Sequence, residues 1–271
     1  MVHLVDCHTH SWYSSDARCN ISELCQAARD RGLAAVAVTD HFDYGPKGES
    51  DADFDKRKTQ RAWELAQVQQ HWQGKLEVLR GIEIGQPHWN VPAATALANC
   101  GDFDLVIGSI HDLRPGKSIY RAYDLTNPEN CDALYAQFLQ EAQEMLRVCD
   151  FDVFGHYDYP LRVMEEGGVS TDMLRWKEPM LDFLKALAQS GVSLEVNTCG
   201  LRRWMQGVGG QDWVLEAFRS VGGKRVTIGS DAHFTRHVGL GVQEVCTLLR
   251  KNGFDKVTVY RQRKPVELSI G

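Results

Sequence analysis

Short runs of β-branched residues alternate with longer segments of helical period about seven times along the 271-residue chain. The pattern predicts strands at 3–7, 34–39, 76–84, 104–109, 151–155, 192–196 and 225–229, with a further candidate at 256–260. It predicts helices at about 21–31, 55–73, 92–98, 128–147, 173–189, 211–221 and 238–251. Alternation at this spacing indicates right-handed βαβ units and a parallel sheet. Seven or eight such units close most economically into an α/β barrel, which we expect to be one domain over residues 1–271.

Composition limits the partners that such a chain can bind. The formal net charge of -6 at pH 7 produces no field that would attract long nucleic acid. It does not exclude a short nucleotide as a ligand. No apolar run approaches the about 18 residues of a membrane span, and no basic stretch precedes one at the N-terminus. The eight cysteines form no CxxC pair, so we interpret them as reduced, mostly buried side chains. These features predict a cytoplasmic protein without a membrane partner, and they leave the oligomeric state open.

Histidines and carboxylates gather where the predicted strands end. Active sites of α/β barrels are built from these C-terminal strand ends and the loops after them. Six of the ten histidines stand there. In chain order, the ionisable and polar residues at the seven ends are His8 and His10, Asp40 and His41, Glu83, His111 and Asp112, His156, Glu195 and Asn197, and Asp231 and His233. In a strand, residues i and i+2 point to the same face, so His8 and His10 could present two imidazoles to one point.

Imidazoles and carboxylates that converge on one barrel mouth predict a metal site. This donor set suits Zn, Mn or Fe and suits Ca poorly, because Ca prefers oxygen ligands alone. Four to six imidazoles together with Glu83, Asp231 and the further candidate Asp16 are too many ligands for one ion. We therefore expect two to three divalent ions with a bridging carboxylate. The remaining histidines are not first-choice ligands, although His88 lies close enough to Glu83 in sequence to line the mouth.

Seven short motifs give the chain a family resemblance that extends from residue 5 to about residue 250. They are HxHxxxSxD at 8–16, TDH at 39–41, GIEIG at 81–85, GSIH at 108–111, GHYD at 155–158, EVNTCGLR at 195–202 and GSDAH at 229–233. This ordered set resembles the PHP (polymerase and histidinol phosphatase) superfamily. Within the superfamily, the chain looks most like the stand-alone histidinol-phosphate phosphatase branch.

The resemblance implies a distorted, TIM-like (β/α)7 barrel with a trinuclear metal centre. Carried onto this sequence, it gives three sets of ligands. The first ion would take His8, His10, Glu83 and Asp231, the second would share Glu83 and add His111 and His156, and the third would take Asp16, His41 and His233. At the third site this chain has Asp16 where many members have histidine.

The resemblance also implies two arginines that bind the substrate phosphate, at positions matched here by Arg162 and Arg202. A guanidinium group suits bidentate contact with a phosphate monoester. Water bound to the metal, with a pKa near ~7, would supply hydroxide, and two ions could hold the attacking and transferring oxygens for in-line displacement. Asp231 or His233 could protonate the leaving alkoxide, and the sequence does not rank them. The chain has no GxSxG motif and no Walker loop that would offer another route.

The expected function is a metal-dependent phosphomonoesterase acting on a small phosphorylated metabolite, with L-histidinol phosphate as the leading substrate. A second interpretation is a phosphodiesterase or exonuclease acting on short nucleotides, which the acidic composition disfavours. A third is a binding module without catalysis, against which the full set of candidate ligands argues.

Overall fold

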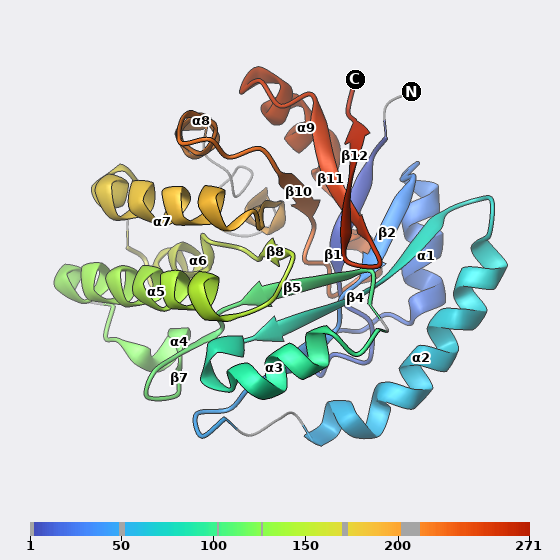
Figure 1. Cartoon of the computed structure of the whole chain (residues 1–271), viewed down its shortest axis with the longest axis horizontal. Coiled ribbons are helices and arrows are strands. Elements are labelled where there is room, and N and C mark those ends of the chain that lie inside the picture. Colours follow the sequence, from blue (N-terminus) through green and yellow to red (C-terminus); the bar gives the residue numbers. More distant parts are fainter. Residues whose placement is uncertain (1–2, 49–51, 102, 126, 170–172, 202–211) are drawn as a thin grey trace.

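Parallel strands form the wall of a nearly closed barrel in the computed structural model, which describes residues 3–48, 52–101, 103–125, 127–169, 173–201 and 212–271 (Figure 1). Within these residues, seven strands follow one another around the wall in chain order. They are β1 (Val5–Thr9), β2 (Ala35–Val38), β4 (Glu77–Gly85), β5 (Leu105–Ser109), β8 (Val153–Phe154), β9 (Ser193–Asn197) and β10 (Val226–Gly229). The short strand β3 (His41–Asp43) adds to the C-terminal half of β4. The predicted (β/α)7 barrel is confirmed.

The barrel closes where the C-terminal ends of β1 and β10 meet. The Asp231 N–H group donates to the His8 carbonyl at 2.8 Å, and the His10 N–H group donates to the Ala232 carbonyl at 2.9 Å. A single parallel bridge pairs Thr9 with Ala232. This closure brings the first and last polar strand ends of the sequence to the same place.

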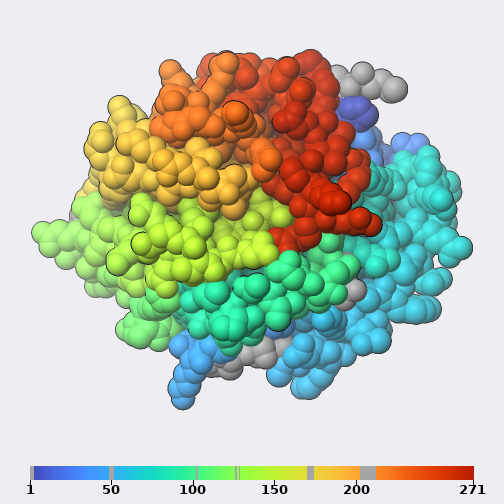
Figure 2. Space-filling model, viewed as in Figure 1, coloured from blue at the N-terminus to red at the C-terminus, as the bar shows by residue number. Residues whose placement is uncertain are grey.

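The predicted last strand forms outside the barrel wall. β11 (Lys256–Arg261) pairs with β12 (Lys264–Ser269) in an antiparallel hairpin. Arg263 Nε donates to Asp152 Oδ2 at 2.7 Å, and the Tyr260 hydroxyl donates to the Asp152 carbonyl at 3.0 Å. Arg263 also reaches the Ala98 carbonyl at 2.9 Å, and Figure 2 shows the red hairpin lying against the green middle of the chain. The hairpin thus covers the N-terminal end of the barrel and leaves the C-terminal end for a site.

The helices lie around the barrel (Figure 1), and each of the seven predicted helices has a counterpart in the predicted order within the described residues. They are α1 (Ile21–Asp30), α2 (Ala52–Trp72), α3 (Val91–Ala98), α5 (Pro128–Val148), α7 (Lys177–Ser190), α8 (Asp212–Ser220) and α9 (Val242–Lys251). Short elements that the pattern did not predict are β6 (Asp112–Leu113), β7 (Lys117–Ser118), α4 (Ile119–Ala122), α6 (Tyr159–Glu166) and the 3-10 turns η1 (Pro87–Trp89), η2 (Met173–Trp176), η3 (Cys199–Leu201) and η4 (Thr235–His237). In the described part of the chain, none of the helices is long and apolar enough to cross a membrane.

Helix α1 shows how the local sequence produces these elements. The Asn20 side chain accepts the Glu23 N–H group at 2.8 Å, and the Glu23 carboxylate accepts the Asn20 N–H group at 3.2 Å. This reciprocal capping box satisfies two N–H groups that the first helical turn leaves without partners. Buried residues at 21, 24, 25 and 28 then form the apolar stripe that packs on the barrel.

Candidate metal centre

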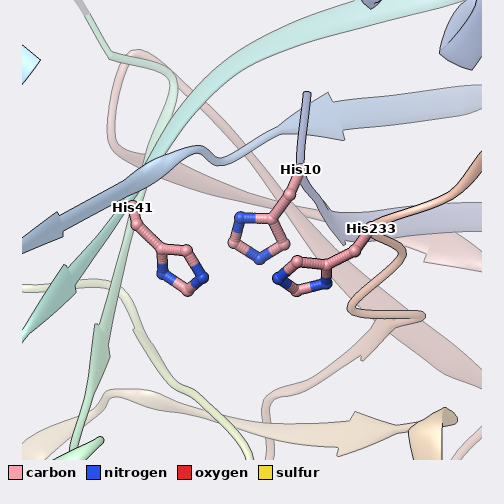
Figure 3. Close-up of side chains that lie close together, drawn as sticks. All are labelled: His10, His41 and His233. Carbon is pink, nitrogen blue, oxygen red and sulfur yellow. The ribbon is translucent and has the colours of Figure 1, made fainter. Parts of the chain in front are cut away.

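Three imidazoles from separate strand ends meet at the C-terminal end of the barrel. Figure 3 shows His10, His41 and His233 with ring nitrogens turned toward a shared space. His10 follows β1, His41 begins β3, and His233 lies in the loop after β10. The ring centroid of His10 lies 4.1 Å from that of His41 and 4.2 Å from that of His233. The barrel thus brings side chains from separate strand ends into one cluster of donor atoms.

Glu83 occupies the middle of the cluster, and its side chain is fully buried. Its Oε2 atom lies 3.3 Å from His8 Nε2 and 3.5 Å from His10 Nε2. Its Oε1 atom lies 2.9 Å from His156 Nε2 and 3.3 Å from His111 Nε2. Oε2 also lies 2.8 Å from His41 Nδ1. The two carboxylate oxygens therefore face different sets of imidazoles, which is the arrangement that a bridging ligand between two ions requires.

Asp231 lies on the other side of the β1 imidazoles. Its Oδ1 atom is 3.3 Å from His10 Nε2, 3.8 Å from His8 Nε2 and 3.5 Å from His233 Nδ1. Asp231 has φ of 51°, a left-handed conformation that aspartate tolerates better than most residues. This backbone conformation directs the carboxylate toward the C-terminal end of β1, where hydrogen bonds close the barrel.

Asp16, the candidate that departs from the family pattern, also reaches the cluster. Its Oδ2 atom lies 3.1 Å from His233 Nε2, and its Oδ1 atom lies 3.8 Å from His41 Nε2. The Asp16 side chain is more than half exposed, unlike the buried Glu83. Asp16 therefore stands at the rim of the cluster, where solvent reaches it.

The structure brings all nine predicted ligands together and groups them somewhat differently from the expected three sets. His8 and His10 group with Asp231, as expected, and Glu83 lies with His156 on one side and His111 on the other. His10 is shared, because it also groups with His41 and His233. The donor atoms in each group lie within 4.8 Å of one another, and the groups are His10–His41–His233, His8–Glu83–His156, His8–His10–Asp231 and His41–Glu83–His111. Metal binding by these residues remains a prediction.

The charges in the cluster favour a cation. His8 Nε2 and His10 Nε2 lie 3.0 Å apart, a distance that suits either a hydrogen bond between the two rings or a metal ion bound by both. Burial disfavours the charged form of His8, but Glu195 and Glu83 outweigh it and raise its pKa well above the usual value. Burial and the neighbouring His41 and His233 lower the pKa of His10 to about 3, so this imidazole is neutral and able to bind a metal.

Two further observations fit a metal ion. The buried atom His156 Nδ1 has no hydrogen-bond partner among the described residues. Buried polar atoms are otherwise almost always paired, so this atom points to a missing partner. Burial raises the pKa of Glu83, whereas the imidazoles of His8, His41 and His111 lower it. Together the imidazoles outweigh burial, so the pKa of Glu83 lies well below the usual value. The donor set thus fits divalent ions held by nitrogen and ionised carboxylate.

Hydrogen bonds from outside the cluster orient several of these rings. His10 Nδ1 lies 3.1 Å from Ser14 Oγ, and the Ser14 hydroxyl donates to Asp40. His111 Nδ1 lies 3.1 Å from Asp43 Oδ2. In each case Nδ1 can donate, which leaves Nε2 as the ligand atom. Ser14 and Asp43 were not predicted, although Asp43 follows His41 by two positions in β3 and so lies on the same strand face.

A pocket of about 360 Å³ opens beside the cluster. The Arg162 guanidinium, on α6, lies on its wall with the Tyr120 and Tyr159 ring centroids at 5.8 and 5.6 Å. Cys199 and His237 also line the pocket, and the sequence pattern assigned neither of them a role. Arg202, the second predicted phosphate ligand, lies outside the described residues.

His88 does not line this pocket. Its Nε2 atom lies 2.9 Å from Glu141 Oε2, and both side chains are buried between η1 and α5. Sequence proximity to Glu83 was therefore misleading for His88, because the 3-10 turn after β4 directs it away from the barrel mouth.

The fold and the cluster together define a parallel α/β barrel with a candidate metal centre at its C-terminal end. In a comparison with known families, the model of the PHP domain matches residues 6–199. The chain belongs to the PHP domain family.

Relatives and solved structures extend the likeness over nearly the whole chain. A probable histidinol-phosphatase of Thermotoga maritima is 27% identical over 257 residues, which cover 94% of this chain and 95% of the relative. The histidinol-phosphatase of Lactococcus lactis is 26% identical over 272 residues, covering 96% of this chain and 95% of the relative. A crystal structure of the histidinol phosphate phosphatase from Lactococcus lactis, complexed with Zn, L-histidinol and phosphate, has a TM-score of 0.79 at 21% identity and covers 98% of this chain and 100% of that chain. This structural likeness shows that the two chains share the fold.

Proposed function

We propose that the chain is a metal-dependent phosphoric monoester hydrolase that converts L-histidinol phosphate and water to L-histidinol and phosphate. The observation that carries the proposal is Glu83, whose two oxygens face different sets of imidazoles beside a pocket lined by Arg162. The names of the relatives from Thermotoga maritima and Lactococcus lactis support histidinol phosphate as the substrate.

We propose that the cluster holds two to three divalent ions, with Zn, Mn or Fe as candidates. The crystal structure of the Lactococcus lactis phosphatase is a complex with Zn, which supports Zn as the first candidate. Bound ions would provide Lewis acidity that activates water and offsets negative charge on the phosphoryl oxygens. Glu83 would hold two of them at a fixed separation, because its side chain is buried and contacts imidazoles on both sides.

Arg162 is the proposed anchor for the substrate phosphate. Its side chain is mostly buried, its Nε atom lies 3.4 Å from Glu166, and the rings of Tyr120 and Tyr159 flank its guanidinium. These contacts fix the planar group before the substrate arrives, so less entropy is lost on binding. Arg202, which matches the second arginine of the family motif, is proposed to bind the same phosphate.

Asp231 and His233 are the proposed groups for proton transfer, and their surroundings differ. Burial opposes ionisation of Asp231, but its contacts with His10, His233 and His8 outweigh burial and hold its pKa well below the usual value. A carboxylate that stays ionised suits cation binding or proton acceptance. His233 donates through Nδ1 to the Asp231 carbonyl at 3.0 Å and is the better proton donor to the leaving oxygen whenever its Nε2 holds no ion.

A phosphatase screen on protein loaded separately with Zn, Mn and Fe tests the proposal. We expect release of phosphate from L-histidinol phosphate to exceed release from other small phosphomonoesters, and we expect two to three ions per chain by elemental analysis. Inactivity of the metal-loaded protein on the whole panel would refute the phosphatase. Faster release of mononucleotides from a short oligonucleotide would instead support a phosphodiesterase, and substoichiometric metal would support a binding module.

A further inference from the structure

Glu195 is a buried carboxylate beneath the cluster that belongs to none of the predicted ligand sets. It lies on β9 and is only 1% exposed. Its Oε1 atom lies 2.7 Å from His8 Nδ1, and its Oε2 atom accepts the backbone N–H group of His156 at 2.7 Å. The Asn197 side chain donates to the same Oε2 atom at 3.1 Å. Both oxygens are therefore committed to hydrogen bonds within the protein.

The neighbouring strand leaves space for this carboxylate. Gly229 ends β10, which pairs in parallel with β9. A Cβ atom at Gly229 would lie 2.1 Å from Glu195 Oε1 and 2.5 Å from His8 Cβ. Any other residue at this position would force apart the two groups that now form the 2.7 Å hydrogen bond. The barrel thus keeps a gap at the point where Glu195 reaches His8.

The second contact of Glu195 fixes an unusual backbone conformation. His156 has φ of 22°, on the left-handed side that few non-glycine residues adopt. Its N–H group points at Glu195, and its ring consequently extends to Glu83, with Nε2 at 2.9 Å from Oε1. A hydrogen bond to a charged acceptor is among the stronger ones and can offset the strain of this conformation.

We infer that Glu195 is a positioning residue that orients one imidazole from each side of the metal centre. Its bond to His8 keeps a proton on Nδ1 and leaves Nε2 to the ion near Asp231. Its bond to His156 sets the other ring against the far oxygen of Glu83. Because one carboxylate bonds to the His8 ring and to the backbone N–H group of His156, it would also couple the positions of the two ion sites. This inference rests on the proposed metal centre.

The variant Glu195→Gln tests the role with little change in volume. An amide has only one acceptor oxygen, so it can replace the bond to His8 or the bond to His156, but not both. Loss of a partner that orients a metal ligand typically weakens metal affinity by about 10- to 100-fold. We expect a loss of that size when zinc binding to the purified full-length protein is measured by competition with a chelating dye.

Asp152→Asn is the matched control. Asp152 is another buried carboxylate of the barrel, but it accepts hydrogen bonds from Val106 and Arg263 at the N-terminal end of the barrel, opposite the cluster. We expect this variant to be less stable than the wild type and to keep its zinc affinity. If Glu195→Gln binds zinc as tightly as the wild type, the inference is wrong while the metal centre stands. If the wild type itself binds no zinc, the metal centre and the inference both fail.

A measurement on the wild type tests the inference even if Glu195→Gln does not fold. In the zinc-loaded protein, the ¹⁵N spectrum of the imidazoles should show His8 with a protonated Nδ1 and with Nε2 bound to the metal. If Glu195 had a purely structural role, His8 would not need to carry its proton on Nδ1. Zinc coordination of His8 through Nδ1 would overturn the inference without any substitution.

Discussion

At the scale of single residues, Arg162 offers a test of how the pocket recognises phosphate. We expect Arg162→Lys to raise the KM for histidinol phosphate by about tenfold or more, because lysine keeps the charge but loses the planar fork and the contacts with Tyr120 and Tyr159. A charge-assisted hydrogen bond contributes about 1.5–3 kcal/mol, which corresponds to this range. Steady-state kinetics and inhibition by inorganic phosphate measure the effect.

Arg175→Lys provides the control for that substitution. Arg175 also lies over an aromatic ring, that of Trp176 at 5.6 Å, and pairs with Asp132, but it does not line the pocket. We expect the KM of this variant to stay within about twofold of that of the wild type, because the substitution changes no contact with the pocket. An equal rise in KM for both variants would argue against a phosphate contact at Arg162.

The residues of the candidate site divide into those that the sequence could reveal and those that it could not. Strand ends identified eight of the nine predicted ligands, because the C-terminal ends of parallel strands share one end of a barrel whatever the details of packing. The ninth, Asp16, came from the motif that the chain shares with the family. The roles of Asp43 and Glu195 depend on side-chain conformations and on the space that Gly229 leaves, neither of which has a periodic signature. His88 was not a first-choice ligand, and only its suggested place at the barrel mouth was wrong, since one turn of 3-10 helix redirects it toward Glu141.

At the scale of elements, Glu141 on α5 joins the helix to the loops that follow β4 and β5. Its carboxylate accepts the His88 ring at 2.9 Å, the Arg114 N–H group at 3.0 Å and the Gln137 amide at 2.9 Å. Burial opposes its ionisation, but these hydrogen bonds outweigh burial and lower the pKa of Glu141 below its usual value.

A carboxyl group whose pKa is lower in the folded state stabilises the protein above the unfolded-state pKa of about 4.3. That contribution is lost as the pH falls through the lower folded-state value. We therefore expect Glu141→Gln to be less stable than the wild type by about 1–2 kcal/mol at pH 7, with a smaller difference at pH 3. Urea unfolding at the two pH values measures it, and a difference that does not change with pH would contradict the assignment.

Long elements followed from the sequence, and short ones did not. The capping box of α1 and its apolar stripe are both local in sequence, so the helix could be predicted to within one residue at its end. Elements such as β6, β7 and α6 are too short for a periodic pattern, and tertiary contacts define them. The strand at 256–260 was predicted correctly, but its place under the barrel depends on partners such as Asp152 that lie far away in sequence.

At the scale of the whole molecule, bound ions should stabilise the barrel, because their ligands come from strand ends that unfolding would separate. His8 lies in the first strand of the barrel wall and Asp231 follows the last, and the closure of the barrel brings them together. A ligand present at 100 times its Kd stabilises the folded state by about 2.7 kcal/mol. For a chain of this size, that corresponds to roughly 5–10 °C in Tm.

We therefore expect a chelator to lower the Tm of the zinc-loaded protein by about that amount in scanning calorimetry. Glu83→Gln distinguishes the cluster from adventitious surface sites, because it removes the charge that both sides of the centre share. The chelator should shift the Tm of this variant much less than that of the wild type. An equal shift in both proteins would place the stabilising ions elsewhere, and no shift in the wild type would mean that metal binding is not coupled to the closure of the barrel.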